Sequence, residues 1–348
     1  TGGQPTGAGS NITNNNLAMM TALGPCNEIG SHISVNELTT VAAVWALAPF
    51  MSGPTNAYLN IGAPASNAAG LALAFSAAEQ VVNTSTGSIG GTNLPSGAVL
   101  PTAEIITLAD ILGYCVNSAG GTAGDSSFCG PLFSDASNGT AFPSDTITAA
   151  MNIAQNPARN VPQLFTLADK APVFQTPLTT APTAWTVAIQ YTGGGLSAPT
   201  AIAADQNGNI WVTNSGSSTV SEFDNLGNSK LGTGVSIAAG TPTGIAIDLS
   251  GNAWITVKSA NSLFELSSSG TLGSAITDNG LSEPTSVAID GGGLVWVVNS
   301  GGTGGNSVSV FTSAGTAVSG SPFSGGGIAS PSGIAINGNA NANCSDCN

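Results

Sequence analysis

Five cysteines carry the most specific chemistry in this sequence: Cys26, Cys115, Cys129, Cys344 and Cys347. Cys115 and Cys129 flank VNSAGGTAGDSSF, a glycine-rich stretch that can fold back as a loop, so we predict a disulfide between them and an oxidising compartment. The terminal CSDC has the spacing of a metal knuckle, but one such pair cannot saturate tetrahedral zinc. Disulfides to partners elsewhere are the leading interpretation for the other three cysteines, and a metal or a redox pair are the alternatives for CSDC. The odd total leaves at least one thiol free or bonded between chains.

Histidine and carboxylate chemistry is sparse. A Ser-His-Asp or Cys-His catalyst needs a histidine base, and His32 is the only histidine of the chain. It precedes the first expected helix, where a surface or capping role is the simpler interpretation. Glu222, Glu265, Asn214 and Asn299 recur at the ends of expected strands, a pattern that suggests no convergence on one metal ion. We therefore predict no catalytic, cofactor-binding or metal-binding residue.

A repeated phrase dominates the second half of the chain. PTAIAADQNGNIWVTN begins at Pro199, and related phrases begin at Pro242 and Pro284. A fourth, PSGIAINGNA, begins at Pro331 and is not completed. Each complete phrase has two short apolar runs on either side of a polar, glycine-bearing turn, and further strand-like segments follow it. Four short antiparallel strands at intervals of roughly 40–50 residues are typical of a β-propeller blade.

The repeated residues have structural duties in such a blade. The prolines begin the first strand, where a missing N–H is tolerated. The tryptophans of the three complete phrases are expected to pack between neighbouring blades, and an aromatic ligand platform is the alternative; they are Trp211, Trp254 and Trp296. Repeated acids or amides precede the turns and are expected to accept backbone N–H groups, with calcium binding as the alternative; they are Asp205, Asp248, Asp290 and Asn337.

PTGIAIDLSGNAWITV and its relatives resemble the repeats of NHL-type and streptogramin-lyase-like propellers, over about residues 199–348. The resemblance implies a propeller fold, in a superfamily that includes lyases, lactonases and binding scaffolds. Lyases of that family depend on histidines within the propeller, and the repeats here contain none, so their catalytic residues cannot be carried over. MTALGPCNEI and PTAEIITLADILGYCVNS are similar to a lead segment that precedes such repeats in secreted bacterial proteins.

The first half of the chain has a helical period. Ser34 and Glu37 are spaced as a capping box at the start of the first helix. Apolar residues recur at helical spacing in five segments, which are expected to form a small bundle: 34–51, 66–82, 101–116, 144–155 and 161–169. After these segments the period changes from 3.6 to 2, and WTVAIQY at 185–191 is expected to be a single strand.

The fold class predicted from these patterns is α+β and multidomain. An all-α domain is followed by all-β propeller-type blades, of which three are complete and one is partial. The expected parts are a flexible segment over 1–12, an Ala-rich helical domain over 13–170, a proline-rich linker over 171–184 and the propeller repeats over 185–348.

Charge excludes several classes of partner. The chain has only 4 Lys and Arg against 18 Asp and Glu, for a net charge of −14. It therefore lacks a basic stripe for nucleic acid and is a poor ligand for anionic membranes.

The longest apolar run, at 41–51, is too short to span a bilayer. The first residue is Thr1 rather than Met, as in a mature secreted protein.

Three blades, a leading strand at 185–191 and a trailing strand at 331–337 would leave strand edges unpaired. The chain could be part of a longer propeller, or 185–191 could pair with the trailing strand, or subunits could pair with one another. We predict a secreted or cell-surface bacterial protein that self-associates through its helical domain and open blade edges into a ring or filament. The alternative is a propeller enzyme, a lyase or lactonase-like hydrolase with a metal site that lacks histidine.

Overall fold

The computed structural model describes residues 13–24, 27, 29–55, 58–139, 141–170, 172–301 and 305–336. The chain divides into two units, Thr1–Tyr191 and Thr192–Asn348. The first unit is mainly helical, and the second consists of antiparallel sheets of three or four strands. The predicted α+β multidomain class with propeller-type blades is therefore confirmed. Cys26, Asn337, Cys344, Cys347 and the segment 1–12 lie outside the described residues.

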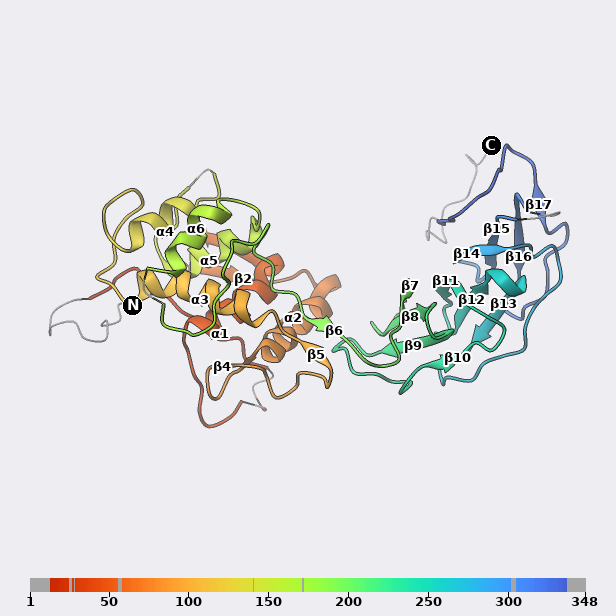
Figure 1. Ribbon diagram of the computed structural model, residues 1–348, viewed down its shortest axis with the longest axis horizontal. Helices are drawn as coiled ribbons and strands as arrows, with labels where there is room; N and C mark the ends of the chain where they lie inside the picture. The colour runs from red at the N-terminus through yellow and green to blue at the C-terminus, as the bar shows by residue number, and fades with distance from the viewer. Residues whose placement is uncertain are drawn as a thin grey trace. The chain divides into compact units, whose positions relative to one another are not determined.

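Helix α1, Glu37–Leu47, is the centre of the first unit (Figure 1). It packs against three of the other helices, α2, α3 and α5. The remaining helices are α2 Ala68–Val81, α3 Thr102–Val116, α4 Cys129–Asp135, α5 Thr146–Gln155 and α6 Val161–Ala168. Two small hairpins join them: β1 Met51–Thr55 with β2 Tyr58–Ile61, and β3 Val82–Asn83 with β4 Ser88–Ile89. Among the described helices none has the length and apolar character needed to cross a membrane.

The cap of α1 differs from the prediction. Asn36, not Ser34, is the N-cap: its side chain accepts the Thr39 N–H, and the Thr39 hydroxyl accepts the Asn36 N–H. The Ser34 hydroxyl instead donates to the carbonyl of Ser85, 2.8 Å away. The capping-box logic was right, but the cap is two residues later because Ser34 is bound to the loop that follows β3.

The segment expected to be a free linker is bound along α3. We call residues 172–186 the strap. Asp110 Oδ1 accepts the N–H groups of Val173 and Phe174, at 2.7 and 2.9 Å. Thr107 Oγ1 accepts the N–H of Leu178 at 2.8 Å, and Glu104 Oε1 accepts that of Thr186 at 2.7 Å. These three acceptors are spaced by three residues on one face of the helix, so together they bind four backbone N–H groups of the strap without a partner strand.

The strand predicted at 185–191 belongs to the first unit rather than to the blades. Trp185 is fully buried in the helical core, and its carbonyl accepts the indole N–H of Trp45 at 3.0 Å. Only β6, Gln190–Tyr191, is a strand, and it pairs with β5, Ala98–Val99. The boundary between the units therefore lies after Tyr191, not at 185 as predicted.

The buried acids of the first unit predict its response to pH. Burial raises the pKa of Glu37, Glu104 and Asp110, although hydrogen bonds from the backbone partly oppose it. The repulsion between Glu37 and Asp110, and between Asp110 and Asp169, acts in the same direction as burial. Each of these pKa values is higher in the folded state than in the unfolded chain. At pH values near and above the unfolded pKa, the folded unit therefore binds more protons than the unfolded chain. We expect the free energy of unfolding of the first unit to increase as the pH falls from 7 towards about 4.5.

Urea titrations of the full chain at several pH values measure this trend, with hydrogen exchange of peptides from 102–186 as the readout for the first unit. Asp110→Asn should flatten it, because the substituted side chain cannot ionise. A free energy of unfolding that falls over the same interval in the wild type would contradict the expectation.

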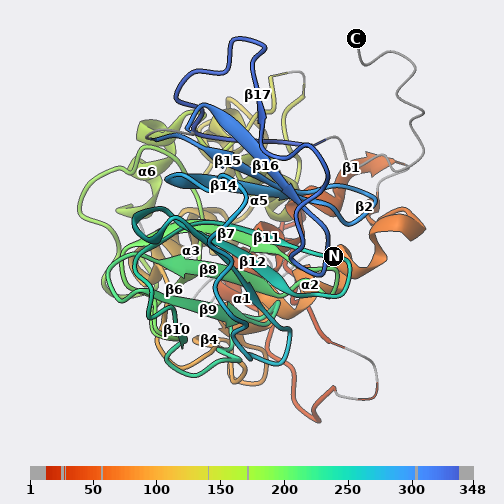
Figure 2. The ribbon, with the colours of Figure 1, turned by 90° about the vertical axis from the view of Figure 1, so that its right-hand side faces the viewer.

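The second unit contains three blades (Figure 2). Blade 1 comprises β7 Pro199–Ala204, β8 Ile210–Asn214, β9 Thr219–Phe223 and β10 Val235–Ser236. Blade 2 comprises β11 Pro242–Ile247, β12 Ala253–Val257 and β13 Ser262–Leu266. Blade 3 comprises β14 Pro284–Ile289, β15 Val295–Asn299, β16 Ser307–Phe311 and β17 Phe323–Ser324. The first strands of successive blades, β7, β11 and β14, are neighbours in space.

The prolines of the three complete phrases, Pro199, Pro242 and Pro284, each begin a first strand, as predicted. In all three blades the register shifts immediately after it, between Pro199 and Ala201 in blade 1 and at the equivalent positions of the other two. A bulge at this point lets the residue without an N–H enter the ladder. The trailing strand predicted at 331–337 differs: residues 331–336 are described but carry no strand.

Candidate functional site

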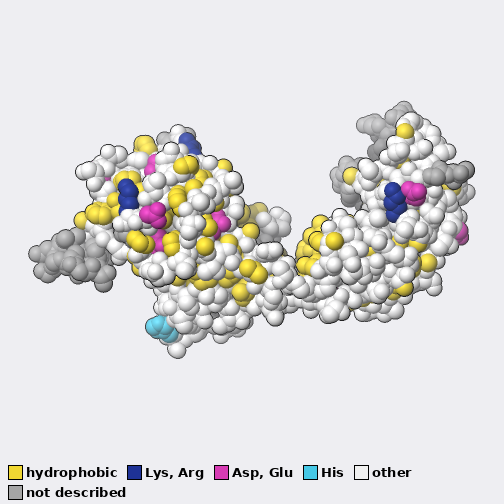
Figure 3. All heavy atoms as spheres, in the orientation of Figure 1, with side chains coloured by type: hydrophobic (Ala, Val, Ile, Leu, Met, Phe, Trp, Pro, Cys, Tyr) yellow, Lys and Arg dark blue, Asp and Glu magenta, His cyan; other side chains and the backbone are white. Residues whose placement is uncertain are grey.

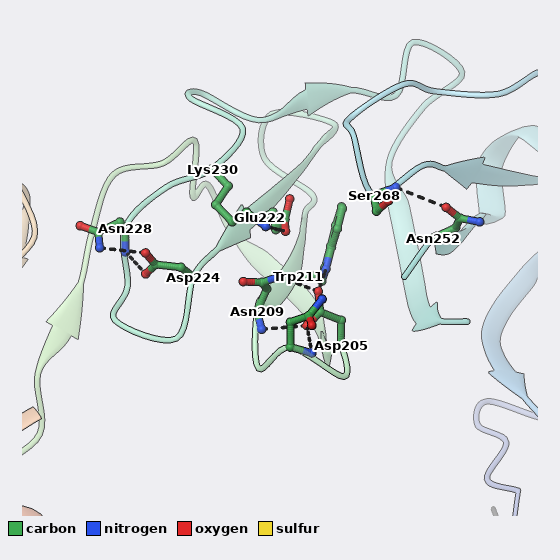
Figure 4. Close-up of polar contacts among 10 residues, drawn as sticks. Asp205, Asn209, Trp211, Glu222, Asp224, Asn228, Lys230, Asn252 and Ser268 are labelled. Atoms are coloured by element: carbon green, nitrogen blue, oxygen red, sulfur yellow. Dashed lines mark hydrogen bonds and ion pairs between the residues drawn. The ribbon is translucent and has the colours of Figure 1, made fainter. Parts of the chain in front are cut away.

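Each blade is organised around an aspartate and a tryptophan on its first hairpin, and Figure 4 shows the pair of blade 1, Asp205 and Trp211. Oδ1 of each aspartate accepts the N–H groups two and four residues further along the chain. Oδ2 accepts the indole N–H of the tryptophan that follows. The three pairs are Trp211 with Asp205 at 3.5 Å, Trp254 with Asp248 at 3.2 Å and Trp296 with Asp290 at 2.9 Å. The aspartates therefore do the turn-capping work expected of them.

Charge on Asp205 and Asp290 stabilises their hairpins. Burial alone would raise the pKa of Asp205 and of Asp290, and it is the largest single influence. The combined hydrogen bonds outweigh it, above all those from the Asn209 amide and the Trp296 indole, and lower both pKa values. Because both carboxylate oxygens accept N–H donors, a calcium ion would have to displace the bonds that hold the turn together.

Neighbouring blades meet through apolar packing. The blade 1 tryptophan, Trp211, is fully buried against Ile245 and Ile255 of blade 2. Trp254 of blade 2 is fully buried against Val287 and Val297 of blade 3. Successive side chains of a strand point to opposite faces of a blade. We call the face that carries the tryptophan and packs on the next blade the outgoing face. The opposite face, with the isoleucine or valine of the first strand, is the incoming face.

Hydrogen bonds fix the alignment of the blades. The threonine that follows each repeat proline donates its hydroxyl to the carbonyl of the next repeat proline. The three bonds are Thr200 to Pro242 at 3.3 Å, Thr243 to Pro284 at 3.1 Å and Thr285 to Pro331 at 3.3 Å. A second link joins blades 2 and 3, where Asn261 Oδ1 accepts the N–H of Glu283 at 2.7 Å. The threonine is visible in the PT dipeptide of the repeat, but its role between blades was not predicted.

The incoming face of blade 1 is open. Ile202 is 69% exposed, whereas its equivalents Ile245 and Val287 are 8% and 6% exposed. Pro199 and Thr200 are exposed as well. These residues border an apolar groove of about 360 Å³, which Leu196, Ala201 and Val212 also line. Figure 3 shows hydrophobic side chains gathered over β7 and β8.

The outgoing face of blade 3 is less covered than its equivalents. Trp296 is partly exposed, whereas Trp211 and Trp254 are fully buried. Trp211 and Trp254 therefore lie between blades, as predicted. Trp296 does not, because no described blade follows blade 3. Blade 1 and blade 3 present the two halves of the same kind of interface, one with an uncovered isoleucine and one with a partly uncovered tryptophan.

The amides and acids weighed for catalysis are bound within single blades. Asn214 and Asn299 donate to the hydroxyls of Ser221 and Ser309, each at 2.9 Å. Glu222 forms an ion pair with Lys230, in view in Figure 4. Asn252 donates to Glu265 Oε1 at 2.9 Å, and burial, followed by repulsion from Asp248, raises the pKa of Glu265. The structure does not bring these side chains together around one site.

Metal and histidine chemistry finds no assembled centre in the described part of the chain. There, no group of three or more His, Cys, Asp or Glu side chains lies close enough to hold a metal ion. His32 is exposed on a loop of the first unit. Cys115 and Cys129, predicted as a pair, are bonded in the structure with their Cα atoms 4.4 Å apart.

A polar pocket of about 450 Å³ lies between blades 2 and 3. Lys258 and Glu283 on its rim form an ion pair of 3.3 Å, with both side chains nearly half exposed. The other lining residues are Thr241, Thr243, Ser259 and Asn261. Two of the six lining residues already form hydrogen bonds to the next blade: Thr243 donates to the Pro284 carbonyl, and Asn261 accepts the Glu283 N–H. The pocket is therefore part of the contact between blades 2 and 3.

Comparison with known proteins gives fold-level likeness only. No family model matches the chain, and no curated protein does. A streptogramin B lyase structure is 20% identical over 42% of this chain and 48% of its own, with a TM-score of 0.36. Virginiamycin B lyase from Staphylococcus aureus is 19% identical over 37% of this chain and 41% of its own, at 0.32. A functionally unknown protein from Desulfotomaculum acetoxidans is 20% identical over 47% of this chain and 51% of its own, with a TM-score of 0.35.

The matched part of this chain spans about half the length of these proteins or less. The first two are streptogramin lyases, the kind of propeller that the repeats resemble. Scores this low carry no argument about activity. The chain is therefore similar to known propeller proteins in its blades, whose strand order over residues 199–324 defines them independently.

Proposed function

We propose that this chain is a structural or interaction protein that self-associates through the open faces of its blades. The supporting observation is Ile202, exposed at a position where its two equivalents are buried by a preceding blade. Exposed apolar surface next to unpaired strand edges is a binding site for another sheet. A second copy of the chain carries a surface built to cover such a face, since its own blades 1 and 2 cover those that follow them.

The proposal includes a secreted or cell-surface location in bacteria. Charged residues make up only 6% of the chain, so hydroxyls and amides supply most of its polar surface. The Cys115–Cys129 bond suits an oxidising compartment. Copies would assemble into a ring or filament, because an interface between two different faces either closes on itself or continues. The helical unit would contribute through exposed apolar side chains such as Phe128 and Phe142.

Ile202→Asp is expected to weaken self-association by about ten- to hundredfold. Burying an isoleucine side chain contributes about 1.5–3 kcal/mol, and each 1.4 kcal/mol is tenfold in affinity. Sedimentation velocity over a range of concentrations measures the dissociation constant of the full chain. Leu249→Asp is the matched control, because Leu249 is 68% exposed on the blade 2 hairpin and should leave association unchanged.

A wild-type chain that sediments as a monomer at every concentration would contradict the proposal, because the face would then be covered within one chain. Equal weakening by the two substitutions would show that added charge, rather than the incoming face of blade 1, governs association.

A further inference from the structure

Residues 331–336 repeat the sequence of a first strand. They read PSGIAI, against PTAIAA in β7 and PTGIAI in β11. They are also bound where the next first strand would lie. Thr285 donates to the carbonyl of Pro331, and Asn306 accepts the N–H of Ser330. These two bonds reproduce those between blades 2 and 3, where Thr243 meets Pro284 and Asn261 meets Glu283.

The segment nevertheless lacks what holds a first strand in place. In blade 2, β11 pairs with β12 through most of its length, and β14 pairs with β15 in the same way. No ladder joins residues 331–336 to any described strand. Two hydrogen bonds attach it to blade 3, one from the Thr285 hydroxyl and one to the Asn306 side chain, and each contributes only modestly in water. Trp296, on the outgoing face of blade 3, remains partly exposed.

A complete blade would occupy the same place more strongly. Blade 1 begins with the same proline and an equivalent hydroxyl residue, and its exposed Ile202 corresponds to the valine that covers Trp254 in blade 3. Its carbonyl at Pro199 could accept from Thr285, as Pro331 does. Blade 1 also brings three further strands that are already paired with β7 or with one another.

We propose that residues 331–336 form an intramolecular cap on the outgoing face of blade 3. This inference rests on the proposed self-association. The incoming face of blade 1 from a second copy displaces this cap. The contact is head-to-tail, with Ile202 of one copy packed on Trp296 of the other. The cap thus sets the concentration at which copies assemble, because each contact must first release it.

Replacement of residues 331–336 by an equally long Gly-Ser sequence tests the cap while keeping all five cysteines. We expect self-association to tighten by about tenfold or more, because the replacement removes the rigid Pro331 and the partly buried side chains of Ile334 and Ile336. The flexible chain then loses more conformational entropy when it makes the two backbone hydrogen bonds, so it competes less well with the partner. Ile202→Asp in the same background should abolish the gain. Sedimentation velocity measures all of these chains, and far-UV circular dichroism checks that each is folded.

Mixing two variants in the Gly-Ser background tests the polarity. Ile202→Asp retains an outgoing face, and Trp296→Ala retains an incoming face. Each alone should associate weakly, and the mixture should form one-to-one dimers that do not grow further. If Ile202 packed on Ile202 of the partner instead, Trp296→Ala alone would still associate and the mixture would gain nothing, which would overturn the head-to-tail contact.

The outcomes separate this inference from the proposed function. If the Gly-Ser chain associates no more tightly than the wild type, while Ile202→Asp still weakens the wild type, the cap is wrong and self-association stands. If the wild type and the Gly-Ser chain are both monomeric at every concentration, both proposals fail.

Discussion

Trp254→Ala should lower the free energy of unfolding of the blade unit by about 3–5 kcal/mol, the range for a fully buried tryptophan truncated to alanine. Trp254 has no exposed surface and packs between blades 2 and 3 against Val287 and Val297. Its indole N–H also binds Asp248, a carboxylate only 7% exposed, which would lose that donor. A loss of this size is a large fraction of the stability of an ordinary domain.

Trp296→Ala is the matched control for this expectation. Trp296 has the same place on its hairpin and the same bond to its aspartate, but it is partly exposed because no described blade follows it. We expect a smaller loss, about 1–2 kcal/mol. Urea titration of dilute full-length chain, followed by hydrogen exchange of peptides from 199–324, measures both values. Equal losses would mean that the outgoing face of blade 3 is as well covered as that of blade 2.

This comparison also shows what the repeat could reveal in advance. The recurrence of proline, aspartate and tryptophan predicted the hairpins and their order, because the proline begins the first strand and the aspartate binds the turn and the indole of the same blade. It could not predict which faces are open. Ile202 and Ile245 follow nearly the same sequence, yet one is exposed and the other buried. The difference lies in the neighbouring blade, and no local pattern encodes a neighbour.

The segment 185–191 illustrates the same limit. Its alternation of apolar and polar residues predicted a strand, and two of its residues do form one. Alternation sets which side chains share a face, but it does not choose the surface that buries them. Here Trp185, Val187 and Ile189 pack on the helical core, and the chain before them is held by acceptors along α3. For this reason residues 185–191 group with the first unit, whereas the prediction grouped them with the propeller repeats.

Helix α4 was missed for a different reason. It has seven residues, contains Pro131 and follows a glycine-rich loop, so it offers too few turns for a helical period to show. Its apolar residues Leu132 and Phe133 are nonetheless fully buried. Long helices such as α3 were predictable because their apolar face repeats over several turns.

Loss of the bond between Cys115 and Cys129 is expected to lower the free energy of unfolding of the first unit by about 3 kcal/mol, through the greater freedom of the unfolded loop. The bond joins the end of α3 to the first residue of α4, across a sequence separation of 14. The double variant Cys115→Ala and Cys129→Ala removes it with little change in side-chain volume. Both positions are fully buried, so the effect should be confined to the helical unit.

Reductant supplies the control, because it should lower the stability of the wild type to that of the double variant and leave the double variant unchanged. Urea titration with hydrogen exchange of peptides from 102–135 measures the unit, and mass spectrometry of alkylated protein counts free thiols. The blade unit should unfold at the same urea concentration in all four samples, since neither cysteine lies within it. Free thiols at both Cys115 and Cys129 in the native chain, with no response of its stability to reductant, would remove the support that this bond gives to an oxidising compartment. The proposed assembly would still rest on the blade faces, while its extracellular location would rest on the low charge content of the chain alone.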